Sequence, residues 1–300
     1  MKVLIAGGAG FLGGWLSKSL RADGHEAIIL TRRASSDASQ IQWDGHTTAG
    51  WGHIVSEMDA VVQLTGYGLE HWPWTDRQKR KFADSRVLPA IALVSAIEKA
   101  SRRPRVFLHH SGINYYGLRS DTAADESSPH ADDFLARLAA ETEAASRPVE
   151  DLGVRRIVVR SAVVLDREEG LFPLMALPVQ LFFGGRFGDG SQSFNWIHII
   201  DHIRAMRFLI ENEDARGSYN SIAPQPTSND EFMRAISRAT RRPYWFHLPT
   251  FLLRMTLGEM SILLTEGRFT RPARLLEAGF KFRFGGLDDA MNDLFGPKGV

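Results

Sequence analysis

The hydrophobic and polar positions of the first 165 residues alternate between short strand-like runs and longer helix-like stretches. Residues 2–6 and 26–30 are compact apolar runs, and between them residues 11–20 repeat apolar side chains at helical spacing. The same alternation continues, with strands predicted at 59–64, 105–110 and 154–165 and helices at 76–99 and 132–152. Strands that alternate with helices of this length predict an α/β fold with a doubly wound parallel sheet. In such a sheet, ligands bind at the carboxyl ends of the strands.

The pattern changes after residue 165, where prolines, phenylalanines and a glycine-rich segment at 184–190 replace the regular alternation. The further elements predicted there are one strand at 217–223 and helices at 201–212, 229–240, 249–266 and 287–294. We therefore expect a smaller, mostly helical C-terminal lobe on the substrate side. The predicted division assigns residues 1–165 plus about 191–223 to the sheet domain, and about 166–190 plus 224–300 to the lobe.

The turn after the first strand is rich in glycine. Gly7 allows a tight turn, Gly10 lets the backbone approach a pyrophosphate, and Gly13 lets the following helix pack closely on the sheet. The helix starts at Phe11 and Leu12, so its free N–H groups face the phosphates. Glycines alone also fit an ordinary turn, but these stand between a strand and a helix that leads to a second strand. The sequence therefore predicts a Rossmann-type site for a dinucleotide cofactor.

The second strand ends at Thr31, Arg32 and Arg33. Enzymes that prefer NAD usually carry an Asp or Glu here, about 20 residues beyond the glycines, for the ribose 2′-hydroxyl. No acid stands here, and an arginine fork matches a phosphate in geometry and charge. We therefore expect NADP(H) as the cofactor, with Arg32 on its 2′-phosphate. A solvated pair of loop arginines is the alternative.

Composition narrows the function classes. The formal net charge of the 300 residues is +1, which gives no basic field for nucleic acid. The absence of cysteine excludes disulfides and thiolate chemistry, and we expect a cytoplasmic location. Nothing ahead of the first strand resembles a signal peptide. The apolar stretches at 171–183 and 245–264 are interrupted by prolines or charges, so we expect no membrane partner.

Two histidines raise the question of a metal site. His198 and His202 lie four residues apart with Asp201 between them, a spacing that can place two imidazoles on one helix face. No glutamate stands where a zinc-hydrolase helix requires one, and the sequence offers no third ligand. We therefore expect no metal.

Several motifs occur in a fixed order along the chain. The first set is Ala6-Gly7-Gly8-Ala9-Gly10-Phe11-Leu12-Gly13, Leu64-Thr65-Gly66, Ser111-Gly112-Ile113-Asn114-Tyr115-Tyr116-Gly117 and Trp196-Ile197-His198-Ile199-Ile200-Asp201. This set resembles the extended short-chain dehydrogenase/reductases of the NAD-dependent epimerase/dehydratase type. A second set is similar to an atypical, poorly characterised branch of them: Trp74-Thr75, Ser85-Arg86-Val87, Asp133-Phe134-Leu135-Ala136 and Leu257-Gly258-Glu259-Met260. The resemblance covers essentially the whole chain, and implies cofactor contacts at Leu64, Thr65 and Gly66 and an unknown small-molecule substrate.

The same resemblance exposes a gap in the chemistry. Catalytic members of the wider superfamily use a tyrosine with a lysine four residues later to exchange a proton while hydride moves. Alignment on the helix that carries this pair places Phe134 and Leu138 at the two positions, and neither can transfer a proton. Arg86 replaces the usual asparagine, and is expected to bind a cofactor phosphate or an anionic substrate, with a surface salt bridge as the alternative. Of the usual set only Ser111 remains.

Three functions fit this gap. The first is an oxidoreductase in which Tyr115 or Tyr116 donates the proton and Ser111 hydrogen-bonds the substrate. The second is a catalytically silent NADP(H)-binding protein, such as a sensor, in which the tyrosines only pack. The third is a nucleotide-sugar epimerase or dehydratase, which rests on the resemblance. Related enzymes often dimerise through two long helices, here 76–99 and 132–152, so a homodimer is one expectation.

Overall fold

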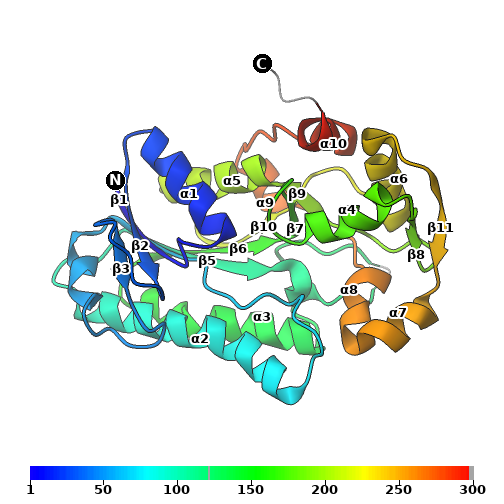
Figure 1. Ribbon diagram of the computed structural model, residues 1–300. Helices are drawn as coiled ribbons and strands as arrows, with labels where there is room; N and C mark the ends of the chain where they lie inside the picture. The colour runs from blue at the N-terminus through cyan, green and yellow to red at the C-terminus, as the bar shows by residue number, and fades with distance from the viewer. Residues whose placement is uncertain (121, 297–300) are drawn as a thin grey trace.

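A computed structural model describes residues 1–120 and 122–296. In this part of the chain, seven parallel strands form one sheet with helices on both faces (Figure 1). Their spatial order is β10 (Gly217–Ser221), β6 (Arg155–Ser161), β5 (Val106–Gly112), β4 (Ala60–Gln63), β1 (Lys2–Ala6), β2 (Glu26–Thr31) and β3 (Gln40–Gln42). The predicted doubly wound α/β fold is confirmed. The strand order reverses direction between β1 and β4, which is where such sheets bind ligands.

Helices α1 (Phe11–Ala22) and α5 (Ile199–Glu211) cover one face of the sheet, and α2 (Asp76–Lys99) and α3 (Phe134–Ala145) cover the other (Figure 1). The strand residues alternate between the two cores because successive side chains of a strand point to opposite faces. In β1, Val3 and Ile5 join the core under α1 and α5, whereas Leu4 and Ala6 join the core under α2. Burial on both faces explains why these strands are continuous apolar runs in the sequence.

A third core lies beyond one end of the sheet, at the right of Figure 1, where the mostly helical lobe gathers. The elements there are β7 (Val163–Leu165), α4 (Phe172–Gln180), β8 (Gly184–Phe187), β9 (Trp196–His198), α6 (Asn229–Thr240), β11 (Tyr244–Leu248), α7 (Thr250–Leu257), α8 (Ile262–Thr265) and α10 (Leu287–Phe295). Helix α9 (Ala273–Glu277) packs instead on β10, and its Leu275 joins the core under α1 and α5. Short 3-10 turns complete the chain at Gly52–Glu57, Ile113–Tyr116, Arg147–Val149 and Gly258–Ser261. The exact domain boundaries drawn from the sequence stay a prediction.

Three predicted elements are interrupted. The helix predicted at 132–152 begins only after Asp133, whose side chain caps the N–H of Ala136, and it ends at Ala145 shortly before Pro148. The strand predicted at 154–165 splits because β6 pairs with β5 while β7 leaves the sheet to pair with β9. The helix predicted at 249–266 breaks at Gly258, which has a φ of 55°.

The strand pair β8–β11 was not predicted. Its first strand lies in the glycine-rich segment, which has too few apolar residues to indicate a strand. A Cβ at Gly185 would lie 1.8 Å from the carbonyl oxygen of Phe246, so only glycine permits this approach. The glycines therefore serve strand contact within the lobe.

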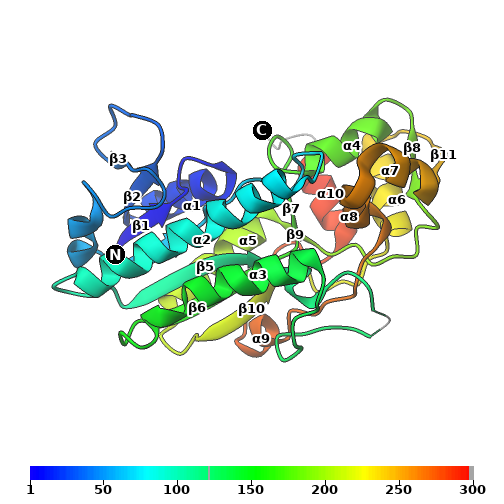
Figure 2. The same ribbon diagram turned by 90° about the horizontal axis from the view of Figure 1, so that it is seen from below.

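Helices α2 and α3 run side by side on their face of the sheet (Figure 2). They are the helices through which we expect a homodimer, and that expectation stays a prediction. No helix among the described residues is long and apolar enough to cross a membrane.

Candidate cofactor and substrate site

Packing within the protein explains two of the three glycines in the turn after β1, but not the third. Gly7 has a φ of 84°, and a Cβ there would lie 2.9 Å from the carbonyl carbon of Leu64 at the end of β4. A Cβ at Gly13 would lie 2.4 Å from the Cα of Gly8, so Gly13 lets α1 pack against the turn itself rather than against the sheet. At Gly10 the nearest atom would be 3.4 Å away, so the protein itself leaves room for a side chain. A ligand approaching the backbone would account for glycine at that position.

The first turn of α1 leaves its backbone N–H groups without a side-chain cap. Gly10 is the N-cap residue in extended conformation, and no side chain caps the first turn, which starts with Phe11 and Leu12. Uncapped N–H groups at the positive end of a helix bind phosphate. The ring of Phe11 is covered from outside by the loop that contains Gly170, where a Cβ would lie 2.9 Å from it. The structure therefore brings the predicted phosphate-binding residues together beside the switch point of the sheet.

The end of β2 is cationic. Thr31 is buried, and its Oγ1 accepts the N–H of Arg33 at 3.2 Å. Arg32 and Arg33 are exposed. The carbonyl of Arg32 accepts a hydrogen bond from the side-chain amide of Gln42 at 3.4 Å, which ties this turn to β3. Because both side chains are exposed, their guanidinium groups can bind an anion at this edge of the sheet while they stay partly hydrated.

A second cation lies under the end of β4. The segment Leu64–Gly66 begins with a hydrogen bond of 2.8 Å from the N–H of Leu64 to the carbonyl of Ala6. A Cβ at Gly66 would lie 3.2 Å from the guanidinium of Arg86, so Gly66 makes room for this side chain. Burial lowers the pKa of Arg86 to about 10, although the charge of Glu70 opposes this shift. Within the described residues its guanidinium donates to the carbonyl of Phe82 at 2.9 Å and forms no ion pair. A largely buried cation that forms no ion pair can bind an anionic ligand.

Thr65 lies between Leu64, which bonds to Ala6, and Gly66, which makes room for Arg86. Its backbone N would lie 3.0 Å from a Cβ at Gly7, and its Oγ1 is 3.5 Å from the side-chain nitrogen of Gln63. The predicted residues of the first and fourth strands are thus neighbours at one edge of the sheet.

The end of β5 carries the predicted catalytic residues. The hydroxyl of Ser111 is buried and finds no hydrogen-bond partner among the described residues. Such an orphaned hydroxyl is free to bind a ligand atom. Tyr115 and Tyr116 follow in a 3-10 turn, with their rings edge to face at 5.4 Å.

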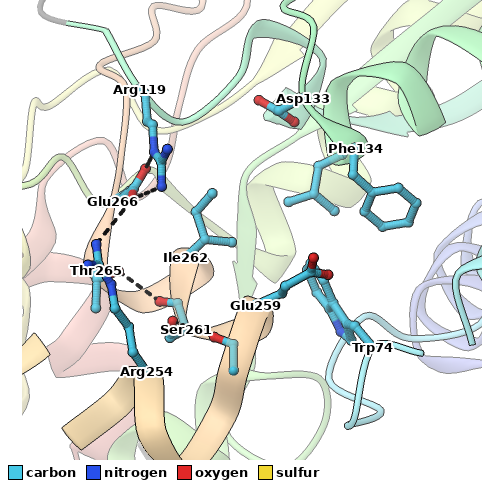
Figure 3. A pocket seen from close by; sticks show the side chains of 12 residues that line it. Trp74, Arg119, Asp133, Phe134, Arg254, Glu259, Ser261, Ile262, Thr265 and Glu266 are labelled. Atoms are coloured by element: carbon cyan, nitrogen blue, oxygen red, sulfur yellow. Dashed lines mark hydrogen bonds and ion pairs between the residues drawn. The ribbon is translucent and has the colours of Figure 1, made fainter. Parts of the chain in front are cut away.

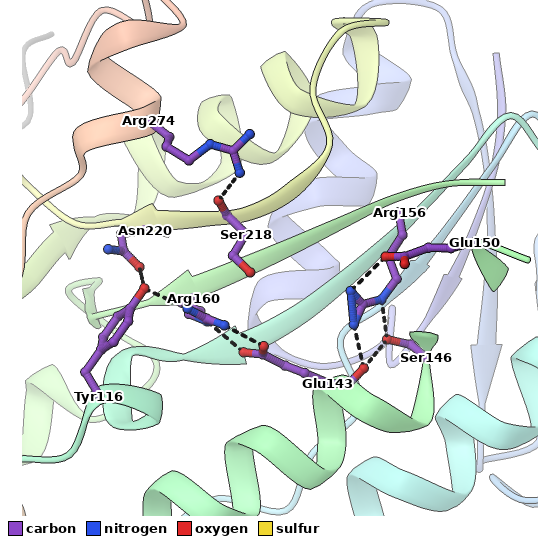
Figure 4. A network of polar contacts seen from close by, with 9 residues as sticks. All are labelled: Tyr116, Glu143, Ser146, Glu150, Arg156, Arg160, Ser218, Asn220 and Arg274. Atoms are coloured by element: carbon purple, nitrogen blue, oxygen red, sulfur yellow. Dashed lines mark hydrogen bonds and ion pairs between the residues drawn. The ribbon is translucent and has the colours of Figure 1, made fainter. Parts of the chain in front are cut away.

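Tyr116 is part of a buried polar network (Figure 4). Its hydroxyl donates to Asn220 at 2.8 Å and accepts from Arg160 at 2.8 Å, and burial raises its pKa to about 12. Arg160 forms a bidentate ion pair with Glu143, with two contacts of 2.8 Å. The same guanidinium lies 3.4 Å from the centre of the half-buried ring of Tyr115. These contacts commit the Tyr116 hydroxyl to supporting Arg160. The ring of Tyr115 packs on Arg160, and its hydroxyl forms no hydrogen bond with the part of the chain that the structure describes.

Phe134 and Leu138 lie in the first turns of α3. The Phe134 ring packs edge to face against Trp74 at 5.9 Å, and the ammonium of Lys79 lies 4.9 Å from its centre. Leu138 is buried in the core beneath. The contacts of both residues are those of packed apolar side chains.

A pocket of about 410 Å³ opens beside Phe134, between the start of α3 and the α7–α8 segment (Figure 3). Its walls are apolar at Trp74, Phe134 and Ile262 and charged at the rim. At the rim, Glu266 forms an ion pair with Arg119, with one contact of 2.6 Å. The side of the pocket that the α7–α8 segment forms was not predicted from the sequence, although the motif Leu257-Gly258-Glu259-Met260 lies there.

The residues considered for a metal have structural contacts. The carboxylate of Asp201 accepts the backbone N–H groups of Arg283 and Phe284 at 2.9 and 2.7 Å. His202 hydrogen-bonds Ser221 at 2.8 Å, and Nδ1 of His198 accepts the N–H of Ile200. Asp201 thus anchors the C-terminal segment to α5.

Comparison with known proteins places these features in a family. The model of the NAD dependent epimerase/dehydratase family matches residues 3–222, and a domain of unknown function (DUF1731) matches residues 248–294. Epimerase family protein SDR39U1 of Bos taurus is 36% identical over 98% of this chain and 99% of its own length. Epimerase family protein YfhF of Bacillus subtilis is 31% identical, with 98% of both chains covered.

Solved structures agree with this assignment. The crystal structure of human epimerase family protein SDR39U1 with NADPH has a TM-score of 0.91 and 33% identity, over 98% of this chain and 99% of that chain. UDP-N-acetylglucosamine 4-epimerase from Bacillus cereus has a TM-score of 0.78 at 17% identity, covering 98% of both chains, and shows the common fold alone. By its sequence, its fold and the motifs at the strand ends, this chain belongs to the NAD-dependent epimerase/dehydratase family.

Proposed function

We propose that the protein is an NADP(H)-binding oxidoreductase that acts on a small molecule bound at the end of β5, beside Ser111 and Tyr115. The observation that carries the cofactor choice is the cationic end of β2, where the exposed Arg32 and Arg33 directly follow Thr31 in place of an acid. An acid there would favour the free ribose of NAD, whereas arginine favours a 2′-phosphate. The related human protein was crystallised with NADPH, which supports the same choice.

The roles that we assign follow from the site geometry. The first-turn N–H groups of α1, beyond Gly10, hold the pyrophosphate, and Arg32 holds the 2′-phosphate. The backbone of Leu64, Thr65 and Gly66 lines the cofactor cleft at the switch point, with Arg86 as the buried cation beneath it. The cofactor, when bound, supplies or accepts hydride.

The proton must come from a residue other than Phe134. We assign the substrate hydrogen bond to Ser111, because its hydroxyl is orphaned, and the proton to Tyr115. The guanidinium of Arg160 lies 3.4 Å from the centre of the Tyr115 ring and so fixes the position of that side chain. Tyr116 becomes a positioning residue that holds Arg160, because its own hydroxyl is committed and its raised pKa opposes proton release.

A catalytically silent cofactor-binding protein is the second candidate. The packing of Phe134 and Leu138 favours it, since both usual proton carriers are replaced by apolar side chains in apolar contacts. A nucleotide-sugar epimerase has only the family assignment behind it. For each of these three candidate functions we propose a cytoplasmic location, because the sequence contains no cysteine.

The test has two stages. Calorimetric titration with NADPH and NADH measures cofactor binding, and failure of both to bind would contradict every version of the proposal. NADPH oxidation is then screened against carbonyl and quinone substrates. With an active substrate, Ser111→Ala and Tyr115→Phe should lower kcat strongly at nearly unchanged NADPH affinity, while Tyr219→Phe on β10 should not. NADPH binding without turnover of any substrate would support the silent protein.

A further inference from the structure

The C-terminal lobe exposes large apolar side chains. We define the apolar face as Leu181, Phe182, Phe183, Trp245, Phe251 and Met255. Each exposes more than half of its surface, from 53% for Phe182 to 78% for Met255. Single exposed apolar residues are ordinary, but a group of six from neighbouring segments indicates an interaction surface.

The segments that carry the apolar face are joined by contacts. The indole N–H of Trp245 on β11 donates to the carbonyl of Phe182, just beyond α4, at 2.9 Å. The rings of Phe183 and Phe246 lie edge to face at 6.1 Å. β11 leads through Pro249 into α7, where Phe251 and Met255 are one turn apart. α4, β11 and α7 gather at the same end of the molecule in both views (Figures 1 and 2).

The backbone of Phe182 is strained. Its φ is 71°, in the left-handed region that bulky residues rarely adopt. The conformation leaves the ring exposed, stacked beneath the guanidinium of Arg242 at 4.2 Å. An apolar side chain held in this way suits a contact outside the molecule better than packing within it.

The segment that carries Trp245, Phe251 and Met255 has basic but no acidic side chains. From Phe232 to Gly258 the sequence contains five arginines and no Asp or Glu. Within the described residues, Arg234 pairs with Asp230 of its own helix, and Arg238 and Arg254 approach Asp288 and Glu266. The exposed Arg241 and Arg242 take part in no ion pair there. The cations nearest to Phe182 and Trp245 are therefore available to an external anion.

We propose that the apolar face seats the protein on an anionic lipid bilayer. Aromatic and Met side chains enter the boundary between headgroups and acyl chains, and Arg241 and Arg242 bind headgroup phosphates. A symmetric contact with a second copy would bring the same arginines together without acids to pair them, and like charges oppose such an interface. The contact is peripheral, since no described helix can cross a membrane. It departs from our sequence-based expectation of no membrane partner, which considered only spanning segments.

The experiment is sedimentation of the whole protein with vesicles. Phosphatidylcholine vesicles that contain phosphatidylglycerol should carry the protein down, pure phosphatidylcholine should carry less, and added salt should release it. Phe251→Ser and Met255→Ser should each weaken binding by about tenfold. Arg242→Gln should weaken it by about fivefold. Ile91→Ser on α2 is the matched control, because Ile91 is also 51% exposed but lies outside the apolar face.

Three results would overturn the proposal. The first is wild-type protein that stays in solution with anionic vesicles, and the second is an equal loss of binding in Ile91→Ser. The third is a wild-type dimer that Phe251→Ser converts to a monomer, because a second copy would then cover the apolar face. Thermal unfolding of each variant guards against misfolding, and Arg242→Gln tests the proposal even where the apolar variants unfold.

Discussion

Substitution of Gly10 by alanine separates cofactor binding from folding. The N-cap backbone at Gly10, with φ of −90° and ψ of −179°, suits alanine, and the nearest atom to the new Cβ is 3.4 Å away. Alanine is a poorer N-cap than glycine, but it lowers the entropy of the unfolded chain, so stability should change by less than about 1 kcal/mol. The methyl group would, however, occupy the space through which a pyrophosphate reaches the backbone.

The loss of affinity can be estimated from the contacts displaced. A hydrogen bond from a backbone N–H to a charged oxygen contributes about 1.5–3 kcal/mol. Displacing one or two such bonds should cost about 3 kcal/mol, which is about a hundredfold in Kd. Calorimetric titration with NADPH measures Kd, and urea unfolding measures stability.

Neighbouring glycines provide the controls. Gly13→Ala should lower stability by about 1–3 kcal/mol together with binding, because its Cβ would lie 2.4 Å from the Cα of Gly8. Gly14→Ala has nothing within 4 Å and should stabilise the helix without affecting NADPH. Wild-type affinity in Gly10→Ala would refute a pyrophosphate at this turn.

Three further predictions concern other parts of the molecule. Arg32→Ala should weaken NADPH by about tenfold or more and leave NADH nearly unchanged in calorimetric titration, and equal weakening would reject the 2′-phosphate contact. Glu143→Gln leaves the buried Arg160 without its ion pair and should cost about 3–5 kcal/mol in urea unfolding. Burial lowers the pKa of His109 to about 3 and of His110 to about 4, below the ordinary 6.5. Between about pH 6.5 and 4 the unfolded chain binds protons that the folded chain does not. The free energy of unfolding should therefore decrease as the pH is lowered through this range, by up to about 1.4 kcal/mol per pH unit for each histidine. Flat stability across that window, measured by urea unfolding, would contradict the burial of these rings.

The cofactor side of the site could be predicted because its signals are local. Gly7, Gly10 and Gly13 lie within one turn, and Arg32 directly follows a strand whose apolar run is evident in the sequence. The helices at Asp76–Lys99 and Asn229–Thr240 also have the predicted bounds, since Thr75 and Ser228, directly before them, cap their first turns.

The substrate side could not be predicted in the same way. Its pocket joins Phe134 to Ile262 and Glu266, which are far apart in the sequence. The environment of Tyr116 depends on Arg160 and Asn220, which reach it from other strands. A sequence pattern could name Tyr116 as a candidate acid, but not show that its hydroxyl is already bonded.

The sequence by itself determined the doubly wound sheet, the glycine turn after β1 and the family, because strand periodicity, glycine and helix caps act over a few residues. Only the tertiary structure decided where the chain breaks its long predicted elements and which hydroxyls are free. It also decided that Phe182 and Met255 face solvent although their type favours burial. Burial and pairing are properties of contacts between distant segments, and such contacts exist only after the chain has folded.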